Sequence, residues 1–214
     1  MKGLGLVLIF AASFMPLPAV SKAPPPAGMP NLHEGDIVFI RSASAQAPAI
    51  AEVMGSSWTH VGVAVMRDSK WFIAETAATV SLTPPADFLG KSRDGEFIVK
   101  RLKKWASRPA KNDLARLKEW LFSNIGKKYD IYFEWSDAAL YCSEYVWKAY
   151  YSALPEHPAL SKPQKFSELN VTGPLARQLI DKRYKAAGKN INMDELIVTP
   201  VALLNSGLLL TVPH

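Results

Sequence analysis

The chain contains a single cysteine, Cys142, which cannot form a disulfide within the chain. Tyr145, Val146 and Ala149 follow it with helical spacing, which places the thiol in the first turn of a predicted helix. Free backbone N–H groups and the helix dipole at such a position favour a thiolate, and the same N–H groups can stabilise an oxyanion. Thiolate is the nucleophilic form of cysteine. We therefore expect Cys142 to be a catalytic nucleophile, the alternative being an inert buried thiol.

A nucleophilic cysteine needs a base, and histidine is the usual one. The chain has four histidines. His33 precedes the predicted domain, His157 lies in a proline-flanked loop and His214 is the terminal residue. His60 instead begins a predicted strand, where the fold can hold its ring rigidly. We therefore expect His60 to be the base that serves Cys142.

The strand pattern also predicts a carboxylate partner for this histidine. Residues 60–66 and 71–75 are predicted strands joined by a polar turn. If that turn has two or four residues, Gly62 lies opposite Glu75, and His60 and Glu75 share one face of the sheet. A carboxylate there would fix the imidazole tautomer and stabilise its charged form. A three-residue turn would place Glu75 on the other face, and an edge-strand ion pair is the alternative role for this residue.

Metal, cofactor and nucleic-acid chemistry have little support in the sequence. There is no second cysteine and no histidine pair with metal-ligand spacing, so we expect no zinc site. There is also no glycine-rich phosphate loop, and the predicted thiol chemistry needs no cofactor. The net charge is +6, with the densest basic run at residues 100–104, but no nucleic-acid-binding motif accompanies it. We expect contact with an anionic envelope surface, or simply a solvated basic face.

The N-terminal sequence predicts export. Residues 1–21 combine a lysine, an apolar run and small residues before a cleavage site, the pattern of a signal peptide. An uncleaved membrane anchor is the alternative. Residues 22–34 are predicted to be a proline-rich spacer, and residues 35–214 a single domain. We expect the protein to be periplasmic or secreted.

Within that domain, short β-branched and aromatic runs alternate with segments of helical spacing. The pattern predicts an α+β domain with a small, mainly antiparallel sheet packed on a central cysteine-bearing helix. The predicted strands are residues 37–40, 60–66, 71–75, 79–82 and 97–102, and the predicted helices are 48–54, 112–124, 142–152 and one that begins at residues 199–200.

An ordered set of short motifs resembles a known family. The motifs are Gly35–Phe39, Thr59–Val63 followed by Glu75, Gly126–Asp130, Trp135–Asp137 and Tyr141–Lys148. They resemble the YiiX-like proteins, which are circularly permuted relatives of NlpC-type papain-like hydrolases in which the histidine strand precedes the cysteine helix. The resemblance runs from about residue 35 to the C-terminus.

The resemblance implies a permuted papain-like fold in which Cys142, His60 and Glu75 converge as a catalytic triad. Four further residues in or near the motif regions are candidates for the substrate pocket: Asp36, Gln46, Tyr129 and Tyr141. Family members are regarded as amide or ester hydrolases that act on cell-wall peptides or lipid-linked acyl groups.

The sequence thus predicts an exported cysteine hydrolase that cleaves an amide or ester bond through an acyl-enzyme. The alternatives are a lipid acyltransferase with the same triad and a non-catalytic ligand-binding protein that keeps the cleft. We expect a small peptide or lipid substrate, and the sequence predicts no particular oligomeric state.

Overall fold

The computed structural model describes residues 24, 26–29 and 31–213. The predicted signal peptide, residues 1–21, therefore lies outside the described residues. Within the described part of the chain, no helix has the length and apolar character needed to span a bilayer.

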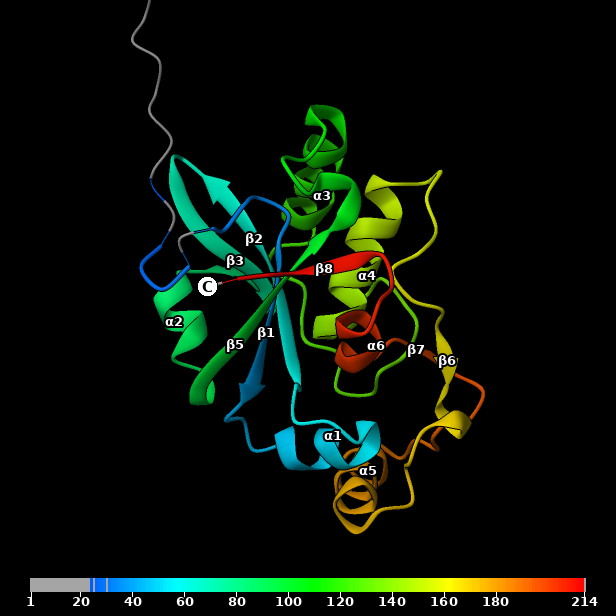
Figure 1. The fold of residues 1–214 in the computed structure, drawn as a ribbon. Coiled ribbons are helices and arrows are strands. Elements are labelled where there is room, and N and C mark those ends of the chain that lie inside the picture. Colours follow the sequence, from blue (N-terminus) through cyan, green and yellow to red (C-terminus); the bar gives the residue numbers. More distant parts are fainter. Residues whose placement is uncertain (1–23, 25, 30, 214) are drawn as a thin grey trace, which may run out of the picture.

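A six-stranded antiparallel sheet forms the centre of the domain, with strand order β4-β3-β2-β1-β5-β8 (Figure 1). All five predicted strands are present. The C-terminal edge strand β8 and the first five residues of β5 were not predicted. The strands are β1 Ile37–Ser42, β2 His60–Arg67, β3 Lys70–Thr76, β4 Val80–Thr83, β5 Ser92–Leu102 and β8 Leu209–Val212, and a separate ribbon pairs β6 Gln164–Lys165 with β7 Leu196–Ile197.

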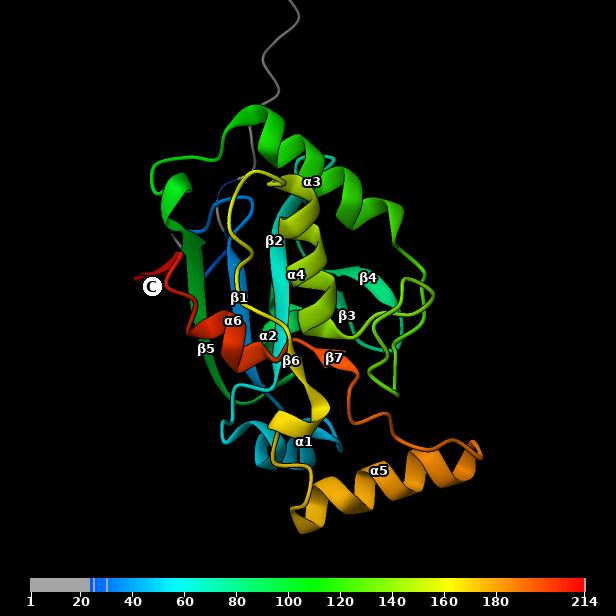
Figure 2. The same cartoon turned by 90° about the vertical axis from the view of Figure 1, so that its right-hand side faces the viewer.

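Helices cover both faces of the sheet (Figure 2). The cysteine-bearing helix α4 packs against β2 and β3, with α3 outside it and α6 beside it. Helix α2 covers the opposite face, while α1 and α5 pack together at one end of the molecule. The α+β prediction is confirmed, although α2 and α5 were not predicted. The helices are α1 Ala47–Met54, α2 Pro85–Leu89, α3 Lys111–Ser123, α4 Cys142–Ala153, α5 Pro174–Ala186 and α6 Pro200–Leu204, with short 3-10 turns at η1 Lys103–Trp105 and η2 Phe166–Glu168.

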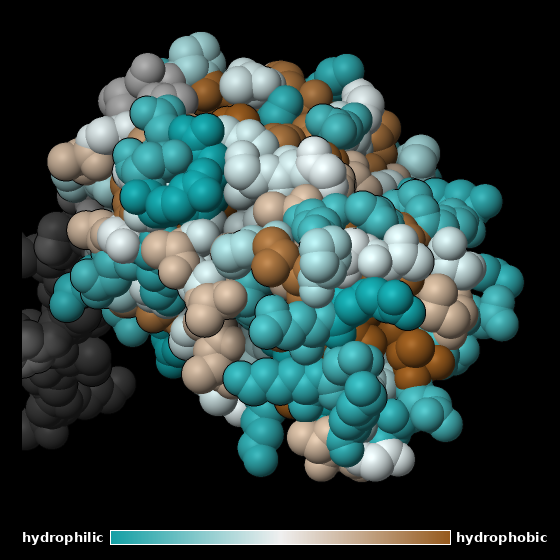
Figure 3. Space-filling view, turned by 90° about the horizontal axis from the view of Figure 1, so that it is seen from below, coloured by the Kyte–Doolittle hydropathy of each residue, from teal (hydrophilic) through white to brown (hydrophobic). Residues whose placement is uncertain are grey.

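At one end of the molecule, α1 and α5 pack mainly against each other rather than against the sheet. Figure 3 shows this end, where hydrophilic side chains surround small hydrophobic areas. The carboxylate of Glu52 on α1 accepts a hydrogen bond of 2.8 Å from the backbone N–H of Ala176, in the first turn of α5. A Cβ on Gly173 would lie 2.3 Å from that carboxylate, so the absence of a side chain there permits the cap.

The folded domain begins upstream of residue 35. Met29 and Leu32, in the predicted spacer, are buried against the face of the sheet that α2 also covers. Near them, the guanidinium of Arg101 donates two hydrogen bonds of 2.7 and 2.8 Å to the buried carboxylate of Asp36. The backbone N–H of His33 donates a third, of 2.7 Å. Asp36 therefore anchors the N-terminal segment to the sheet.

The β2–β3 hairpin has the register that the sequence predicted. Arg67 pairs with Lys70, and Gly62 lies opposite Glu75. The two turn residues, Asp68 and Ser69, both have positive φ angles, of 50° and 58°. This conformation belongs to the two-residue turn that suits the twist of a hairpin. The turn thereby places Glu75 on the same face as His60.

Gly62 permits close packing across this hairpin. A Cβ at this position would lie 2.5 Å from a methyl carbon of Ile73, 2.9 Å from the carbonyl oxygen of Ala74 and 3.3 Å from the Cβ of Glu75. Atoms of β3 already fill this space, so any side chain at position 62 would clash with them.

We predict that Gly62→Ala lowers the free energy of unfolding by about 1–3 kcal/mol, because the new methyl group must displace the β3 backbone or Ile73. Urea unfolding of the purified protein measures the change. Gly207→Ala is the matched control, since a Cβ there meets no atom within 4 Å. Equal stability of the two variants would contradict this reading of the hairpin.

Candidate active site

Cys142 is the first residue of α4, and the structure fixes this helix start on two sides. The backbone N–H of Tyr141 donates to the carboxylate of Glu144 at 3.4 Å, which closes the first turn. The hydroxyl of Ser143 donates to the carbonyl of Val198 at 2.7 Å, and the backbone N–H of Val198 donates to the hydroxyl of Tyr141 at 3.0 Å. The thiol therefore sits at a rigid helix N-terminus, as the sequence predicted.

His60 begins β2 and reaches Glu75 on β3. Its Nε2 lies 2.6 Å from Oε2 of Glu75, and both side chains are buried. The ring packs against Phe88 of α2, with ring centroids 5.6 Å apart. Because Nε2 is engaged by the carboxylate, Nδ1 is the nitrogen left for the hydrogen bond between His60 and Cys142. The structure thus brings together the three residues that the sequence singled out.

The second oxygen of the Glu75 carboxylate has its own partner. Nζ of Lys91 lies 2.5 Å from Oε1, and the Thr83 side chain also hydrogen-bonds to this carboxylate. Lys91 follows α2 and is partly exposed, so its cationic end enters the site from the surface. Lys91 was not predicted, because no local sequence pattern marks a residue that approaches the site from another element.

The charges of this cluster support one another. Burial acts to lower the pKa of His60, but hydrogen bonds to Cys142 and Glu75 and the negative charges of both outweigh it and raise the pKa from 6.5 to about 9. Burial likewise acts to raise the pKa of Glu75, yet His60, Lys91 and Thr83 lower it from 4.5 to about 2. At neutral pH the arrangement therefore holds an imidazolium between a carboxylate and the Cys142 sulfur.

A second set of polar residues lies near the thiol. Nε2 of Gln46 donates to the hydroxyl of Tyr129 at 3.4 Å, and the Gln46 carbonyl oxygen accepts from the guanidinium of Arg183 on α5. Burial and, to a smaller extent, the negative charge of Cys142 raise the pKa of Tyr129, so this phenol stays protonated. Arg183 also donates to the carbonyl of Ile131 at 2.9 Å, and it was not anticipated from the sequence.

The four predicted pocket residues thus have different places. Tyr129 and Tyr141 line the cavity beside Cys142. Gln46 does not line the cavity but donates a hydrogen bond to the hydroxyl of Tyr129. Asp36 is the exception: its carboxylate is bound by Arg101, and it does not line this cavity. The prediction that Asp36 faces substrate is therefore corrected to a structural role.

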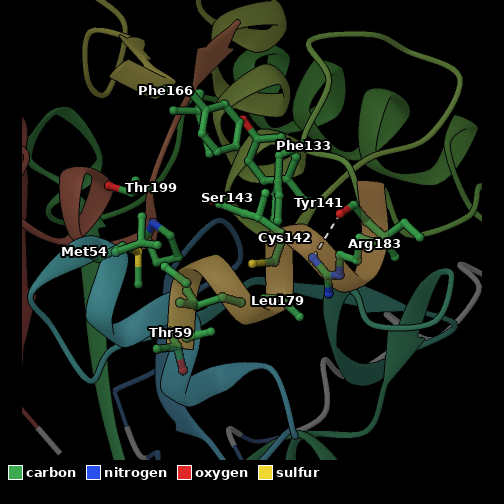
Figure 4. A pocket seen from close by; sticks show the side chains of 18 of the residues that line it. Met54, Thr59, Phe133, Tyr141, Cys142, Ser143, Phe166, Leu179, Arg183 and Thr199 are labelled. Carbon is green, nitrogen blue, oxygen red and sulfur yellow. Dashed lines mark hydrogen bonds between the residues drawn. The ribbon is translucent and has the colours of Figure 1, made fainter. Parts of the chain in front are cut away.

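The cavity beside Cys142 has a volume of about 670 Å³, including the part that opens to solvent. Several hydroxyl groups in its wall are hydrogen-bonded to the protein backbone. The hydroxyls of Ser143 and Tyr184 donate to backbone carbonyl groups, and those of Thr59 and Thr199 accept from backbone N–H groups. Figure 4 shows the Cys142 sulfur among the apolar side chains. The apolar lining includes Ala49, Ile50, Val53, Met54, Ile131, Phe133, Phe166, Ala176, Leu179, Ile180, Ile197, Val198 and Pro200.

We predict that the imidazole of His60 stays protonated well above neutral pH, and that Cys142→Ala lowers its pKa because a hydrogen bond and a nearby negative charge are lost. The ring resonances of His60 in an NMR titration measure both values. Glu75→Gln should also lower the pKa. An unchanged His60 pKa in both variants would contradict the coupling.

The same shifts determine how this cluster affects stability. Because the pKa of His60 is raised on folding, its contribution to the free energy of unfolding is fully present below about pH 6.5. That contribution is lost as the pH rises through about 9. Because the pKa of Glu75 is lowered on folding, its contribution to the free energy of unfolding is fully present above about pH 4.5 and is lost as the pH falls towards 2. The stability difference between wild type and His60→Gln, measured by urea unfolding, should therefore shrink from pH 6.5 to pH 9.

Comparison with known proteins places this geometry in a family. Residues 31–212 match the model of the permuted papain-like amidase enzymes, the YaeF/YiiX or C92 family. The uncharacterized protein YiiX of Escherichia coli K12 is 33% identical over 178 residues, which cover 83% of this chain and 84% of that protein. The crystal structure of the metalloprotein yiiX from Escherichia coli O157:H7, DUF1105, superposes with a TM-score of 0.77 and 33% identity, covering 85% of this chain and 97% of that one.

The description of that relative as a metalloprotein raises the question of a metal in the present chain. Among the residues described here, no three His, Cys, Asp or Glu side chains are grouped so that they could hold an ion. The imidazole of His60 and the carboxylate of Glu75 are bound to each other, and Lys91 occupies the other carboxylate oxygen. This donor set does not fit a metal.

The family model matches 182 residues of the chain, and the relative of known structure has the same fold. Both findings agree with the observed site, in which a thiol at a helix start faces a histidine on a strand. The chain belongs to the permuted papain-like amidase family of YaeF and YiiX, and it is a papain-like cysteine hydrolase.

Proposed function

We propose that this enzyme cleaves an amide or ester bond that links a long acyl chain to a polar group, with Cys142 as nucleophile. The apolar cavity beside the thiol carries this proposal. A peptide backbone placed there would lose most of its hydration and gain few hydrogen bonds, because most of the lining is apolar and the hydroxyls of Ser143 and Tyr184 already donate to backbone carbonyl groups. An acyl chain loses nothing of this kind on entering. On the sequence of residues 1–21 we further propose that the enzyme acts outside the cytoplasm.

The first half of the reaction forms an acyl-enzyme. The Cys142 thiolate attacks the carbonyl carbon, and a sulfur–carbon bond forms while the carbonyl oxygen takes up the electron pair. When this intermediate collapses, the carbon–nitrogen or carbon–oxygen bond breaks and the proton on Nδ1 of His60 passes to the leaving group. Glu75 keeps the imidazole in the required tautomer by accepting from Nε2.

The second half releases the acyl group. Water gives a proton to His60 and its oxygen attacks the thioester carbon, so that the carbon–sulfur bond breaks and a carboxylic acid leaves. The negative oxygen that forms in both halves needs donors. We assign this role to the free backbone N–H groups at the start of α4 and to the hydroxyl of Tyr129, whose oxygen already accepts from Gln46 and whose proton is thereby free to point elsewhere.

We predict that Cys142→Ala and His60→Gln each lower turnover by roughly 10³-fold or more, since each removes a member of one chemical unit. His60→Gln should also slow alkylation of Cys142 by iodoacetamide at pH 7, because the imidazolium no longer supports the thiolate. Peptide mass spectrometry measures the alkylation rate. His157→Gln, at an exposed histidine, is the matched control and should change neither quantity. Equal alkylation in both histidine variants would refute the assigned base.

The acyl specificity is tested with a series of p-nitrophenyl esters and matching anilides of increasing chain length. We predict that kcat/KM rises with length, by up to about fourfold for each methylene group that the cavity buries. Leu179→Trp narrows the cavity and should cost long substrates about tenfold or more while sparing acetyl substrates. Leu175→Trp, one turn earlier on α5 at an exposed position that does not line the cavity, should alter neither. A preference for cell-wall peptides over all acyl substrates would overturn the proposal, and free fatty acid as product separates hydrolysis from transfer to an acceptor.

A further inference from the structure

We infer that the end of the molecule formed by α5 docks on the surface of an anionic lipid bilayer and takes its substrate from there. We call this surface the α5 face: the outer side of α5 with residues 187–196 after it, and the adjoining Ile131. The inference rests on the proposed acyl substrate, because a lipid with a long chain is held in a bilayer rather than in solution.

The α5 face forms the outer side of the cavity wall. The inner side of α5 lines the cavity with Ala176, Leu179 and Ile180. The helix is fixed to α1 through the Glu52 cap and to the active site through the bond from Arg183 to Gln46. If α5 lies on a membrane surface, only the thickness of this helix therefore separates that surface from an acyl chain in the cavity.

The α5 face is basic. Residues 174–196 contain five basic and three acidic residues. One of the basic residues, Arg183, binds Gln46 and lines the cavity, so the cations left for the outer surface are Arg177, Lys182, Lys185 and Lys189. Lys185 pairs with Asp181 at 3.1 Å and Lys189 with Glu134 at 2.7 Å. Arg177 and Lys182 are exposed and make no ion pair with any residue that the structure describes. The face thus has cations that the rest of the described protein does not neutralise, and these are complementary to anionic head groups.

The same face carries apolar side chains. Six large apolar side chains are exposed in the described structure. Leu175 lies on α5, and Ile131 lies beside it, where its carbonyl accepts from Arg183. Met193 and Leu196 follow α5 in the chain and lie beside η2 and β6, and all four side chains are 38 to 43% exposed. Ile131 is also part of the cavity lining, so the exposed apolar surface continues into the cavity. Small apolar areas surrounded by hydrophilic side chains are visible at this end of the molecule in Figure 3.

Cations together with exposed apolar side chains are the two features by which a helix lies in a membrane interface. The cations attract an anionic surface within about a Debye length, and the apolar side chains enter the head-group region. In this orientation an acyl chain can pass from the bilayer to the thiol along Ile131 and the inner side of α5. A soluble partner would not explain why the apolar surface leads into an apolar cavity beside the thiol.

Vesicle co-sedimentation tests the inference. We predict that the protein without residues 1–21 binds vesicles of phosphatidylcholine with 30% phosphatidylglycerol, and that it binds pure phosphatidylcholine vesicles at least about tenfold more weakly. Binding should also weaken as salt is raised from about 0.05 to 0.5 M. Charge reversal by Arg177→Glu with Lys182→Glu should reduce binding to the anionic vesicles by about tenfold or more.

Lys70→Glu with Lys111→Glu is the matched control. These exposed lysines lie at the β2–β3 turn and the start of α3, at the opposite end of the molecule, and their reversal changes the net charge equally. The control should retain binding to the anionic vesicles. Equal losses in the two double variants, or equal binding of the wild type to both kinds of vesicle, would overturn the docking surface.

The experiment also separates this inference from the proposed reaction. Both charge variants should hydrolyse a water-soluble short-chain ester at the wild-type rate, and Cys142→Ala should bind vesicles as the wild type does. Hydrolysis of micellar or soluble esters without any vesicle binding would refute the docking surface alone. Vesicle binding without any hydrolysis would refute the proposed function and leave the surface intact.

Discussion

The pairing of β2 with β3 in a single register is the constraint on which the candidate active site depends. Side chains alternate along a strand, so a slip of one residue would turn Glu75 away from His60 and leave a buried carboxylate without its partner. The positive φ angles of Asp68 and Ser69 fix the turn, and the bare Cα of Gly62 lets the strands pack closely beside Glu75. With Nε2 committed to Glu75, only Nδ1 can serve Cys142, so the hairpin also determines which nitrogen handles the proton.

This constraint explains why the centre of the site was predictable from sequence. The turn between residues 66 and 71 and the alternation of the two strands are local signals, and together they placed Glu75 beside His60. The helix start at Cys142 is likewise local, because the apolar stripe of α4 begins immediately after it. A single cysteine and one strand-borne histidine then left few combinations.

The features that were missed depend on contacts between distant segments. Lys91 reaches Glu75 from the loop after α2, and Asp36 is bound by Arg101, 65 residues away; neither pairing leaves a mark in the local sequence. Met29 and Leu32 lie in a proline-rich stretch that reads as a spacer until the face of the sheet that needs covering is known. Helix α5 is polar overall, and its narrow apolar side becomes recognisable as a helix face only against α1 and the cavity.

Chemistry and specificity are therefore supplied by different parts of the fold. The sheet and α4 hold the reacting groups, while α1 and α5 contribute much of the apolar wall that, in the proposed function, selects the acyl chain. The hydrogen bonds from Arg183 to Gln46 and from Gln46 to Tyr129 connect the two parts, so the position of α5 bears directly on the proposed oxyanion donor. In an amidase family, this division would allow the leaving group to vary while the acyl side stays apolar.

The central claim is that Cys142, activated by His60, becomes acylated during turnover. The most direct measurement is peptide mass spectrometry of the protein quenched in acid during hydrolysis of a long-chain p-nitrophenyl ester. The account predicts a hydroxylamine-sensitive acyl group on Cys142, present in the wild type and missing in His60→Gln. Continued turnover with no acyl group on Cys142, or with the acyl group on another residue, would contradict it.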